Sequence, residues 1–147
     1  MPKIGTISHP KFSAHKNGTD QTGIVTGTWT KITFGTEVYD VGAAYDAANS
    51  KWIPGVIGQA HISASTVFTV PVDQQQMQVA VYINGVIHKR TFFVASGTES
   101  AGPVIGIDIP ITAAADYIEI YALHNFGINK DIYGIATITF FMGHMLP

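Results

Sequence analysis

Residues 117–123 read Tyr-Ile-Glu-Ile-Tyr-Ala-Leu, and this stretch decides the fold class. Side chains alternate between the two faces of a β-strand, which places on one face Ile118, Ile120 and Ala122, and on the other Tyr117, Glu119, Tyr121 and Leu123. A strand with one wet face alternates apolar and polar residues, whereas this strand is apolar on both faces. The sequence therefore predicts a strand that is covered twice.

The last apolar segment, residues 135–146, shows the same two-sided pattern. One face carries Ala136, Ile138, Phe140 and Met142, and the other carries Ile135, Thr137, Thr139 and Phe141. Either both strands lie in mid-sheet under long loops, or one face of each meets the core and the other meets a neighbouring subunit. We favour the second account, which predicts a subunit contact through Ile118, Ile120, Ile138, Phe140 and Met142, with the opposite face of residues 117–123 as the alternative.

The rest of the chain also indicates an all-β protein. Runs rich in β-branched and aromatic residues, bounded by Gly, Pro, Asn or Asp, predict strands at Ile32–Phe34, Gln59–Val70, Met77–Ile83, Arg90–Ala95 and Val104–Ile109. Asn84-Gly85 is the strongest turn signal, and it either closes a tight hairpin or carries the chain between two sheets. Many short strands predict a sandwich or barrel. We expect one domain over residues 12–147, preceded by a tether over residues 1–11.

Composition narrows the function classes. Of the 147 residues only 12% are charged, about half the usual share, which is typical of a surface partly lost to self-association. The net charge of −2 disfavours binding to nucleic acid, which needs a clustered basic face. No apolar run approaches the roughly 18 residues of a membrane helix, so no membrane insertion is expected. Met1 to His9 lacks the apolar core of a signal peptide.

The sequence shows no catalytic or metal-binding motif. No two of the six histidines have the i, i+2 or i, i+4 spacing that places paired metal ligands on one face, so no metal is expected to be needed for folding. We expect His61 and His144 to be hydrogen-bonded structural residues within strands. No nucleophile elbow, phosphate loop or dinucleotide fingerprint is present, which predicts a protein that is not an enzyme and binds no cofactor. Asp40 and Asp46 are expected to hold loop amides through short hydrogen bonds.

Three segments carry a family resemblance. They are Glu37-Val38-Tyr39-Asp40-Val41-Gly42 with the following Tyr45-Asp46, Trp52 and Gly58; then Ala115-Asp116-Tyr117-Ile118-Glu119-Ile120; and last Phe141-Met142-Gly143-His144-Met145-Leu146. In this order they resemble the globular heads of the complement C1q and tumour-necrosis-factor-like superfamily. The resemblance spans about Phe12 to Leu146. It implies a ten-stranded jelly-roll sandwich assembled as a homotrimer.

Departures from the family pattern indicate which members of the family this chain resembles most. Pro54 comes one place early, Ile57 stands where that proline is usual, Ala60 replaces an aromatic residue, and His144 replaces a phenylalanine. Collagen-like repeats and family cysteines are missing. These features resemble the phage and bacterial members, in which the domain forms a knob on a fibre or tail needle, rather than the vertebrate members.

The segment between the two doubly apolar strands is the candidate ligand-binding loop. It mixes aromatics, amides and opposite charges, a composition suited to contacts with glycans or proteins. The candidate residues are Phe126, Asn129, Lys130, Asp131 and Tyr133.

We therefore expect a trimeric receptor-binding or adhesion knob of a phage or bacterial fibre, located on a virion or at the extracellular surface. Its partners would be two further copies of itself and a cell-surface glycan or outer-membrane receptor. The alternatives are a carbohydrate-binding module of a secreted enzyme and a purely structural trimerisation cap. A secreted cytokine-like ligand is disfavoured, because the chain has no cysteines and no visible signal peptide.

Overall fold

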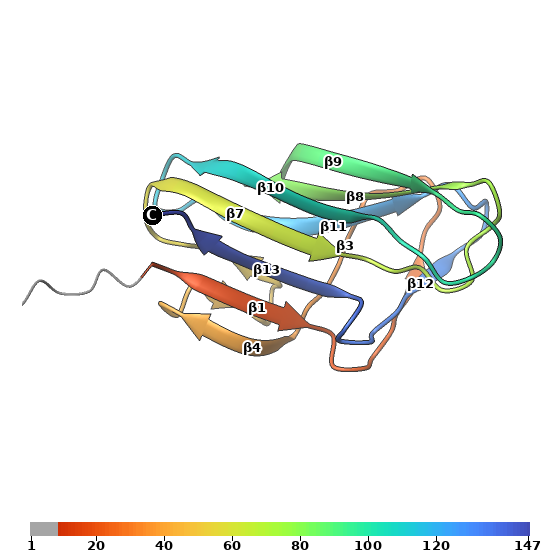
Figure 1. Cartoon of the computed structure of the whole chain (residues 1–147), viewed down its shortest axis with the longest axis horizontal. Helices are drawn as coiled ribbons and strands as arrows, with labels where there is room; N and C mark the ends of the chain where they lie inside the picture. The colour runs from red at the N-terminus through yellow and green to blue at the C-terminus, as the bar shows by residue number, and fades with distance from the viewer. Residues whose placement is uncertain (1–8) are drawn as a thin grey trace, which may run out of the picture.

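Strands joined by turns make up the computed structural model, which describes residues 9–147 and contains no helix in that range (Figure 1). The thirteen strands are β1 (Lys11–His15), β2 (Gln21–Ile24), β3 (Thr30–Lys31), β4 (Thr36–Val41), β5 (Tyr45–Asp46), β6 (Lys51–Trp52), β7 (Gly58–Ser65), β8 (Gln76–Ile83), β9 (Val86–Val94), β10 (Val104–Ile111), β11 (Ile118–His124), β12 (Lys130–Ile132) and β13 (Phe140–Met145). Three of them, β3, β5 and β6, have only two residues, which leaves ten longer strands. None of the described residues forms a helix that is long and apolar enough to cross a membrane.

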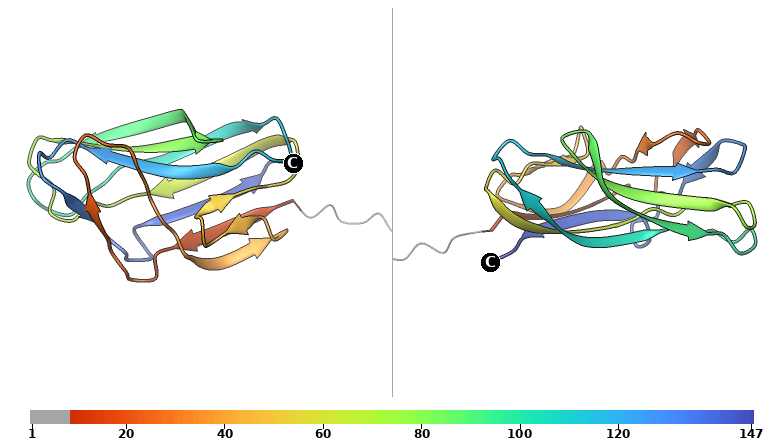
Figure 2. Two further views of the ribbon diagram at one scale, coloured as in Figure 1. Left: turned by 180° about the vertical axis from the view of Figure 1, so that it is seen from behind. Right: turned by 90° about the horizontal axis from the view of Figure 1, so that it is seen from above.

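Two antiparallel sheets face one another across the core (Figures 1 and 2). One sheet has five strands in the order β10-β7-β13-β1-β4. The other has six, in the order β5-β6-β11-β8-β9, with β3 also paired to β11. A separate two-stranded ribbon joins β12 to β2. Neighbouring strands such as β1 and β13 come from opposite ends of the chain, and the predicted jelly-roll sandwich is confirmed.

Inward-facing side chains of both sheets form one core. Its aromatic centre is Phe12, whose ring stacks on Tyr45 at 4.7 Å between centroids and meets Phe141 edge-on at 4.7 Å. Trp52 packs against the same ring at 5.2 Å. Offset and edge-on aromatic pairs each contribute about 0.5 to 1.5 kcal/mol beyond the area that they bury. Phe12 and Phe141, from opposite ends of the chain, therefore meet at the aromatic centre of the core.

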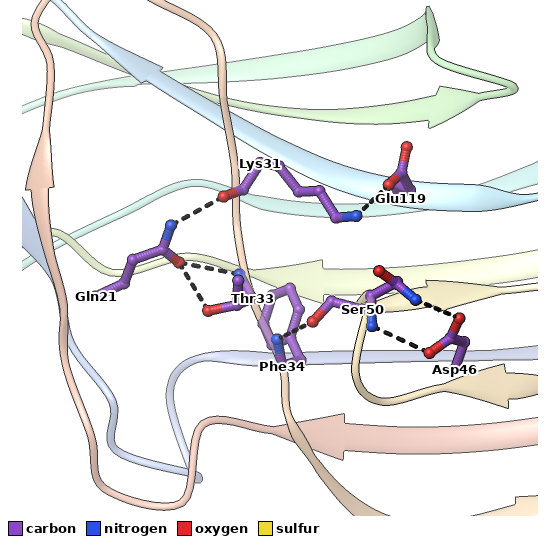
Figure 3. Close-up of polar contacts among 8 residues, drawn as sticks. Gln21, Lys31, Thr33, Phe34, Asp46, Ser50 and Glu119 are labelled. Atoms are coloured by element: carbon purple, nitrogen blue, oxygen red, sulfur yellow. Dashed lines mark hydrogen bonds and ion pairs between the residues drawn. The ribbon is translucent and has the colours of Figure 1, made fainter.

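Strand β11 is buried on one face and half-buried on the other by side chains of its own chain. Ile118 and Ile120 are completely buried in the core of the single chain. Their predicted role in a subunit contact is therefore wrong, because a second chain cannot reach them. On the opposite face Glu119 pairs with Lys31 (Figure 3), and the Tyr121 ring stacks on Tyr82 at 3.9 Å between centroids.

Strand β13 begins at Phe140, five residues later than the sequence pattern predicts. Residues 135–139 form a turn in which the carbonyl of Ile135 accepts hydrogen bonds from the amides of Ile138 and Thr139. Ile138 is thus half-buried in a turn and does not extend the face of the strand. From Phe140 onward the alternation holds, since Phe141 is buried in the core while Phe140 and Met142 lie half-buried on the outer face.

Other boundaries also differ from the predictions. Residues 32–34 form no strand, although Ile32 and Phe34 are fully buried. Lys11 already begins β1 and the carbonyl of Pro10 accepts a hydrogen bond from Met145, so the domain starts before residue 12. Residues 1–8 of the predicted tether lie outside the described residues.

Asn84-Gly85 closes the tight hairpin between β8 and β9. Ile83 and Val86 are paired directly across this two-residue turn. Both turn residues have positive φ, 52° at Asn84 and 77° at Gly85, as hairpin turns of this kind require. Asn84-Gly85 therefore closes a tight hairpin and does not carry the chain between the two sheets.

Candidate functional site

The predicted ligand-binding loop is more tightly built than its composition indicates. Phe126 is buried, with its ring stacked on His124 at 4.6 Å and edge-on to Phe68 at 5.6 Å. It cannot stack on a sugar, so its predicted ligand contact is wrong. Phe126 is buried because its loop folds back over the end of the sandwich core.

The other four candidate residues lie on or beside the ribbon β12–β2. Asn129 is exposed, whereas Lys130, Asp131 and Tyr133 are half-buried. The Asp131 carboxylate accepts a hydrogen bond from the amide of Gly23 at 2.9 Å, which ties β12 to β2. Asn129, Lys130 and Tyr133 therefore remain as possible ligand contacts, and Asp131 positions them.

This ribbon lies at one end of the molecule. Figure 1 shows β12 beside the loops 66–75 and 95–103, at the end of the sandwich opposite to the C-terminus. Phe68 bridges this end, because it pairs with Ala101 on one side and with Ile132 on the other. We call the ribbon and these two loops the distal end.

A second candidate surface is the outer face of the five-stranded sheet. Strand register places Asp108, His61, His144 and Lys11 in one row across β10, β7, β13 and β1. The next row along the strands contains Gly106, Ser63, Met142, Ser13 and Tyr39. Phe140, Met142 and Tyr39 make this face partly apolar, and Tyr39 is 45% exposed. Every residue of these two rows is exposed or half-buried in the single chain.

Asp108, His61 and Ser63 form a hydrogen-bonded relay on this face. His61 Nδ1 lies 2.7 Å from Asp108 Oδ1, and Ser63 Oγ lies 3.2 Å from His61 Nε2. The same order of groups activates the nucleophile of serine hydrolases. Here the relay lies in the middle of a sheet, where Ser63 is paired with Gly106 on one side and Met142 on the other. The ladder therefore engages the backbone amides beside Ser63, which leaves them unable to stabilise an oxyanion there.

A third surface is the free edge of β9. Phe92, Phe93 and Val94 are 67%, 43% and 48% exposed, three consecutive large apolar residues on the last strand of the six-stranded sheet. An exposed apolar edge strand is a template for association unless something covers it. Contiguous exposed apolar residues of this kind typically mark an interaction site.

One polar cavity lies beside Lys16. Its volume is about 230 Å³, and it is lined by Lys16, Thr19, Asp20, Gln21, Thr33 and Gly35. Burial lowers the pKa of Lys16 to about 8, against a smaller opposing effect of Asp20. All three ammonium hydrogens have acceptors, namely Gln21 Oε1 at 3.1 Å, the Thr33 carbonyl at 2.7 Å and Thr33 Oγ1 at 2.9 Å. Gln21 also accepts from the Thr33 amide (Figure 3), so this lysine fixes the loop and is not free for a ligand.

The two aspartates predicted to hold loops do so. Asp40 accepts hydrogen bonds from the amides of Ala44 and Tyr45 at 3.0 and 3.1 Å. Asp46 accepts from the amide and the side chain of Asn49 at 3.0 and 2.8 Å. Among residues 9–147, no group of three or more His, Asp or Glu side chains is arranged to hold a metal ion.

Comparison with solved structures decides the fold family. The globular domain of zebrafish complement 1qA superposes with a TM-score of 0.65 over 95% of this chain and 98% of that chain, at 12% identity. The chain has a C1q/TNF-like fold. Murine APRIL superposes with a TM-score of 0.68 over 94% and 99% of the two chains, at 13% identity. The Eiger TNF of S. frugiperda gives 0.64 over 95% and 94%, at 7% identity.

The C1q/TNF-like fold that the sequence resemblance implied is confirmed by structural comparison. No protein-family profile matches this chain, and no curated protein sequence matches it. Identities of 7 to 13% carry the arrangement of strands and nothing about the ligand. The surfaces described above must therefore be interpreted from their own residues.

Proposed function

We propose that this chain is a non-catalytic binding domain that works as a homotrimer, forming a receptor-binding knob at the tip of a phage or bacterial fibre. The observation that carries the proposal is the presence of two different exposed apolar surfaces on one chain. They are the outer face of the five-stranded sheet and the free edge of β9.

Two different surfaces favour a head-to-tail contact, in which the edge of one copy packs on the sheet face of the next. Such heterologous contacts form closed rings when the rotation between copies closes. The family resemblance in the sequence implies a ring of three. Closure covers the β9 edge of every copy, which removes the association hazard that an exposed apolar edge otherwise presents.

The positions of the two ends of the sandwich support a knob that is held at one end. Strand β1 begins, and β13 ends, at the end of the sandwich opposite to the distal end (Figure 1). A ring held from that side presents three copies of the ribbon β12–β2 outward. Asn129, Lys130 and Tyr133 would then be the residues that meet a cell-surface glycan or outer-membrane receptor.

The trimer is tested by light scattering coupled to size exclusion at micromolar concentration. Wild type is expected to elute with three times the mass of the 15.8 kDa chain. Met142→Asp on the sheet face and Val94→Asp on the edge are each expected to give folded monomers. An unpaired charge buried in the contact costs several kcal/mol, on the order of 3 or more.

Val25→Asp is the matched control. Val25 and Val94 are 47% and 48% exposed, but Val25 lies beside the distal end and outside both surfaces. It is expected to leave the trimer intact. A monomeric wild type contradicts the trimer, and a trimer that survives both test substitutions contradicts the assignment of its surfaces.

A further inference from the structure

The outer face of the six-stranded sheet carries an aromatic cluster of Trp29, Tyr82 and Tyr121. Alternation along β8 and β11 turns both tyrosines away from the core, and their rings stack at 3.9 Å between centroids. The ring of Trp29, which directly precedes β3, lies 6.2 Å from the Tyr82 ring at an angle of 62°. Because these two rings are not parallel, at least one face of the indole is left uncovered by the tyrosines. Another apolar ring face can stack there.

Backbone pairing holds this cluster in place. Ala80 lies opposite Tyr121 in the ladder, and it is fully buried although its side chain points outward with that of Tyr82. On the other side of β11, Lys31 lies opposite Tyr121, and its ammonium pairs with the buried carboxylate of Glu119 (Figure 3). The rings are therefore packed against fixed neighbours, so a ligand that stacks on them loses little affinity to the ordering of side chains.

The cluster offers polar groups as well as ring faces. Among the tyrosine hydroxyls of the described chain, only that of Tyr45 donates a hydrogen bond to another residue. Burial raises the pKa of Tyr82 and that of Tyr121, which keeps both hydroxyls protonated and able to donate at neutral pH. A pyranose has an apolar C–H face and a rim of hydroxyls, so an aromatic surface beside free hydroxyls matches a sugar.

Arg90 adds an uncompensated positive charge at the margin of the cluster. It lies opposite Ala80 on β9, and it is exposed. It belongs to neither of the two ion pairs that form among residues 9–147. Its charge opposes the rise in the pKa of Tyr82, because the guanidinium lies close enough to act on that hydroxyl. In a chain with a net charge of −2, this cation complements an anionic group, and its planar fork matches a carboxylate.

We propose that this face binds an acidic glycan built of carboxylated pyranoses, with one sugar ring stacked on Trp29 and a carboxylate on Arg90. The hydroxyls of Tyr82 and Tyr121 then meet the hydroxyl rim of the sugar. All four residues belong to one chain, so the site does not depend on the trimer. It lies on the opposite side of the sandwich from the sheet face that the proposed trimer covers (Figures 1 and 2). It is a second site, separate from the ribbon β12–β2, and goes beyond the proposed function.

The test is a titration of wild type with hexagalacturonate and with trisialic acid, each beside its methyl ester as the neutral counterpart. Binding is followed by tryptophan fluorescence. Trp52, the other tryptophan of the chain, is fully buried in the core, so a change in fluorescence reports on Trp29. The acidic form is expected to bind about three- to tenfold more tightly than its ester, the range for a charge-assisted contact at an exposed site. The preferred probe distinguishes uronic from sialic acids.

Three variants assign the roles, with binding measured by isothermal calorimetry. Trp29→Leu keeps apolar packing but removes the aromatic face, and it is expected to abolish binding of acid and ester, whereas Trp29→Phe keeps part of it. Arg90→Gln is expected to reduce binding of the acid to the level of the ester and to leave the ester unchanged. Lys89→Gln is the matched control. Lys89 is an exposed cation on the same strand, but it lies opposite the core residue Val81, and its variant is expected to bind as wild type does.

The site is overturned if wild type binds neither acidic probe, or binds acid and ester equally. Undiminished binding by Trp29→Leu or Arg90→Gln, or equal weakening by Arg90→Gln and Lys89→Gln, has the same consequence. Melting temperatures show that each variant is folded. Light scattering of the same samples separates this site from the proposed function. A monomer that binds an acidic probe contradicts the trimer and supports this site, whereas a trimer that binds neither probe overturns this site and leaves the trimer standing.

Discussion

His124 is the buried titratable residue that joins the distal end to the core. Its side chain has no exposed surface. Nε2 lies 2.8 Å from the carbonyl of Ile24, and Nδ1 accepts a hydrogen bond from the amide of Phe126 at 3.3 Å. These partners require a neutral ring with its hydrogen on Nε2. Burial lowers the pKa of His124, against a smaller opposing effect of the bond to Ile24.

This arrangement predicts acid sensitivity with a defined sign. Because the pKa of His124 is lower in the folded chain than in the unfolded one, where it is about 6.5, the unfolded chain takes up the proton first. The stability that His124 contributes is therefore complete above about pH 6.5 and is lost as the pH falls from there toward the folded pKa. Melting temperature measured from pH 7.5 to pH 5 should decline.

Two variants isolate this residue. His124→Gln is expected to lower the free energy of unfolding at pH 7.5 by about 1 to 2 kcal/mol, because stacking and hydrogen bonds are lost. Its melting temperature is expected to fall less between pH 7.5 and pH 5 than that of wild type. His88→Gln should keep the slope of wild type. Parallel slopes for wild type and His124→Gln would show that another group controls the acid response.

At the scale of elements, the β8–β9 hairpin is anchored through one side chain. Asn84 Oδ1 accepts a hydrogen bond from the amide of Tyr117 at 3.0 Å, and Asn84 Nδ2 donates to Asp116 at 2.8 Å. The same carboxylate accepts from the amides of Thr112 and Ala113, which closes the loop between β10 and β11. The bond from Asn84 is the largest of the causes that lower the pKa of Asp116 to about 2.

Asn84→Ala is predicted to destabilise the domain by about 1 to 2 kcal/mol more than Asn17→Ala. Both asparagines have a positive φ, 54° at Asn17 and 52° at Asn84, and both precede a glycine. The backbone cost of the change to alanine is therefore matched. Asn17 is exposed, and only its backbone amide makes a hydrogen bond in the described structure. Urea unfolding of both variants measures the difference, and equal midpoints would contradict the anchoring role of the Asn84 side chain.

At the scale of the whole molecule, a trimer presents three copies of the distal end. Weak contacts at each copy add into useful avidity when the target surface is repetitive. We expect affinity per site in the millimolar range, a rough value for single weak contacts, and much tighter binding to whole bacterial cells or glycan arrays.

The variant Asn129→Ala, Lys130→Ala, Tyr133→Ala is predicted to lose this surface binding while remaining a folded trimer. Val25→Asp is the control, since it changes a neighbouring exposed residue and spares these three. Retention of the triple variant on cells at the level of wild type would remove the ribbon from the binding surface. Absence of binding by wild type to any bacterial surface or glycan would favour a purely structural trimerisation cap.

The sequence by itself determined the fold class and most of the strand positions. Alternation within a strand is a local property, so β8, β10 and β11 lie within two residues of the predicted boundaries at both ends. The Asn84-Gly85 turn was recognisable for the same reason, because its chemistry resides in two adjacent residues. Segments with weak alternation were missed, among them β1, β2 and β4, which depend on partners far away in the sequence.

Only the tertiary structure decided what covers each apolar face. The two faces of β11 and those of β13 look alike in sequence, yet on the outer face of β11 Glu119 is buried beside Lys31 and Tyr121 stacks on Tyr82, whereas Phe140 and Met142 lie half-buried on the open outer face of the five-stranded sheet. The composition of the loop after β11 likewise indicated a binding site, but the folded structure buries its Phe126 in the core. Periodicity reports that a side chain is apolar and which way it points. Whether its own chain or another molecule meets it depends on contacts between segments far apart in the sequence, and these exist only after the sheets have assembled.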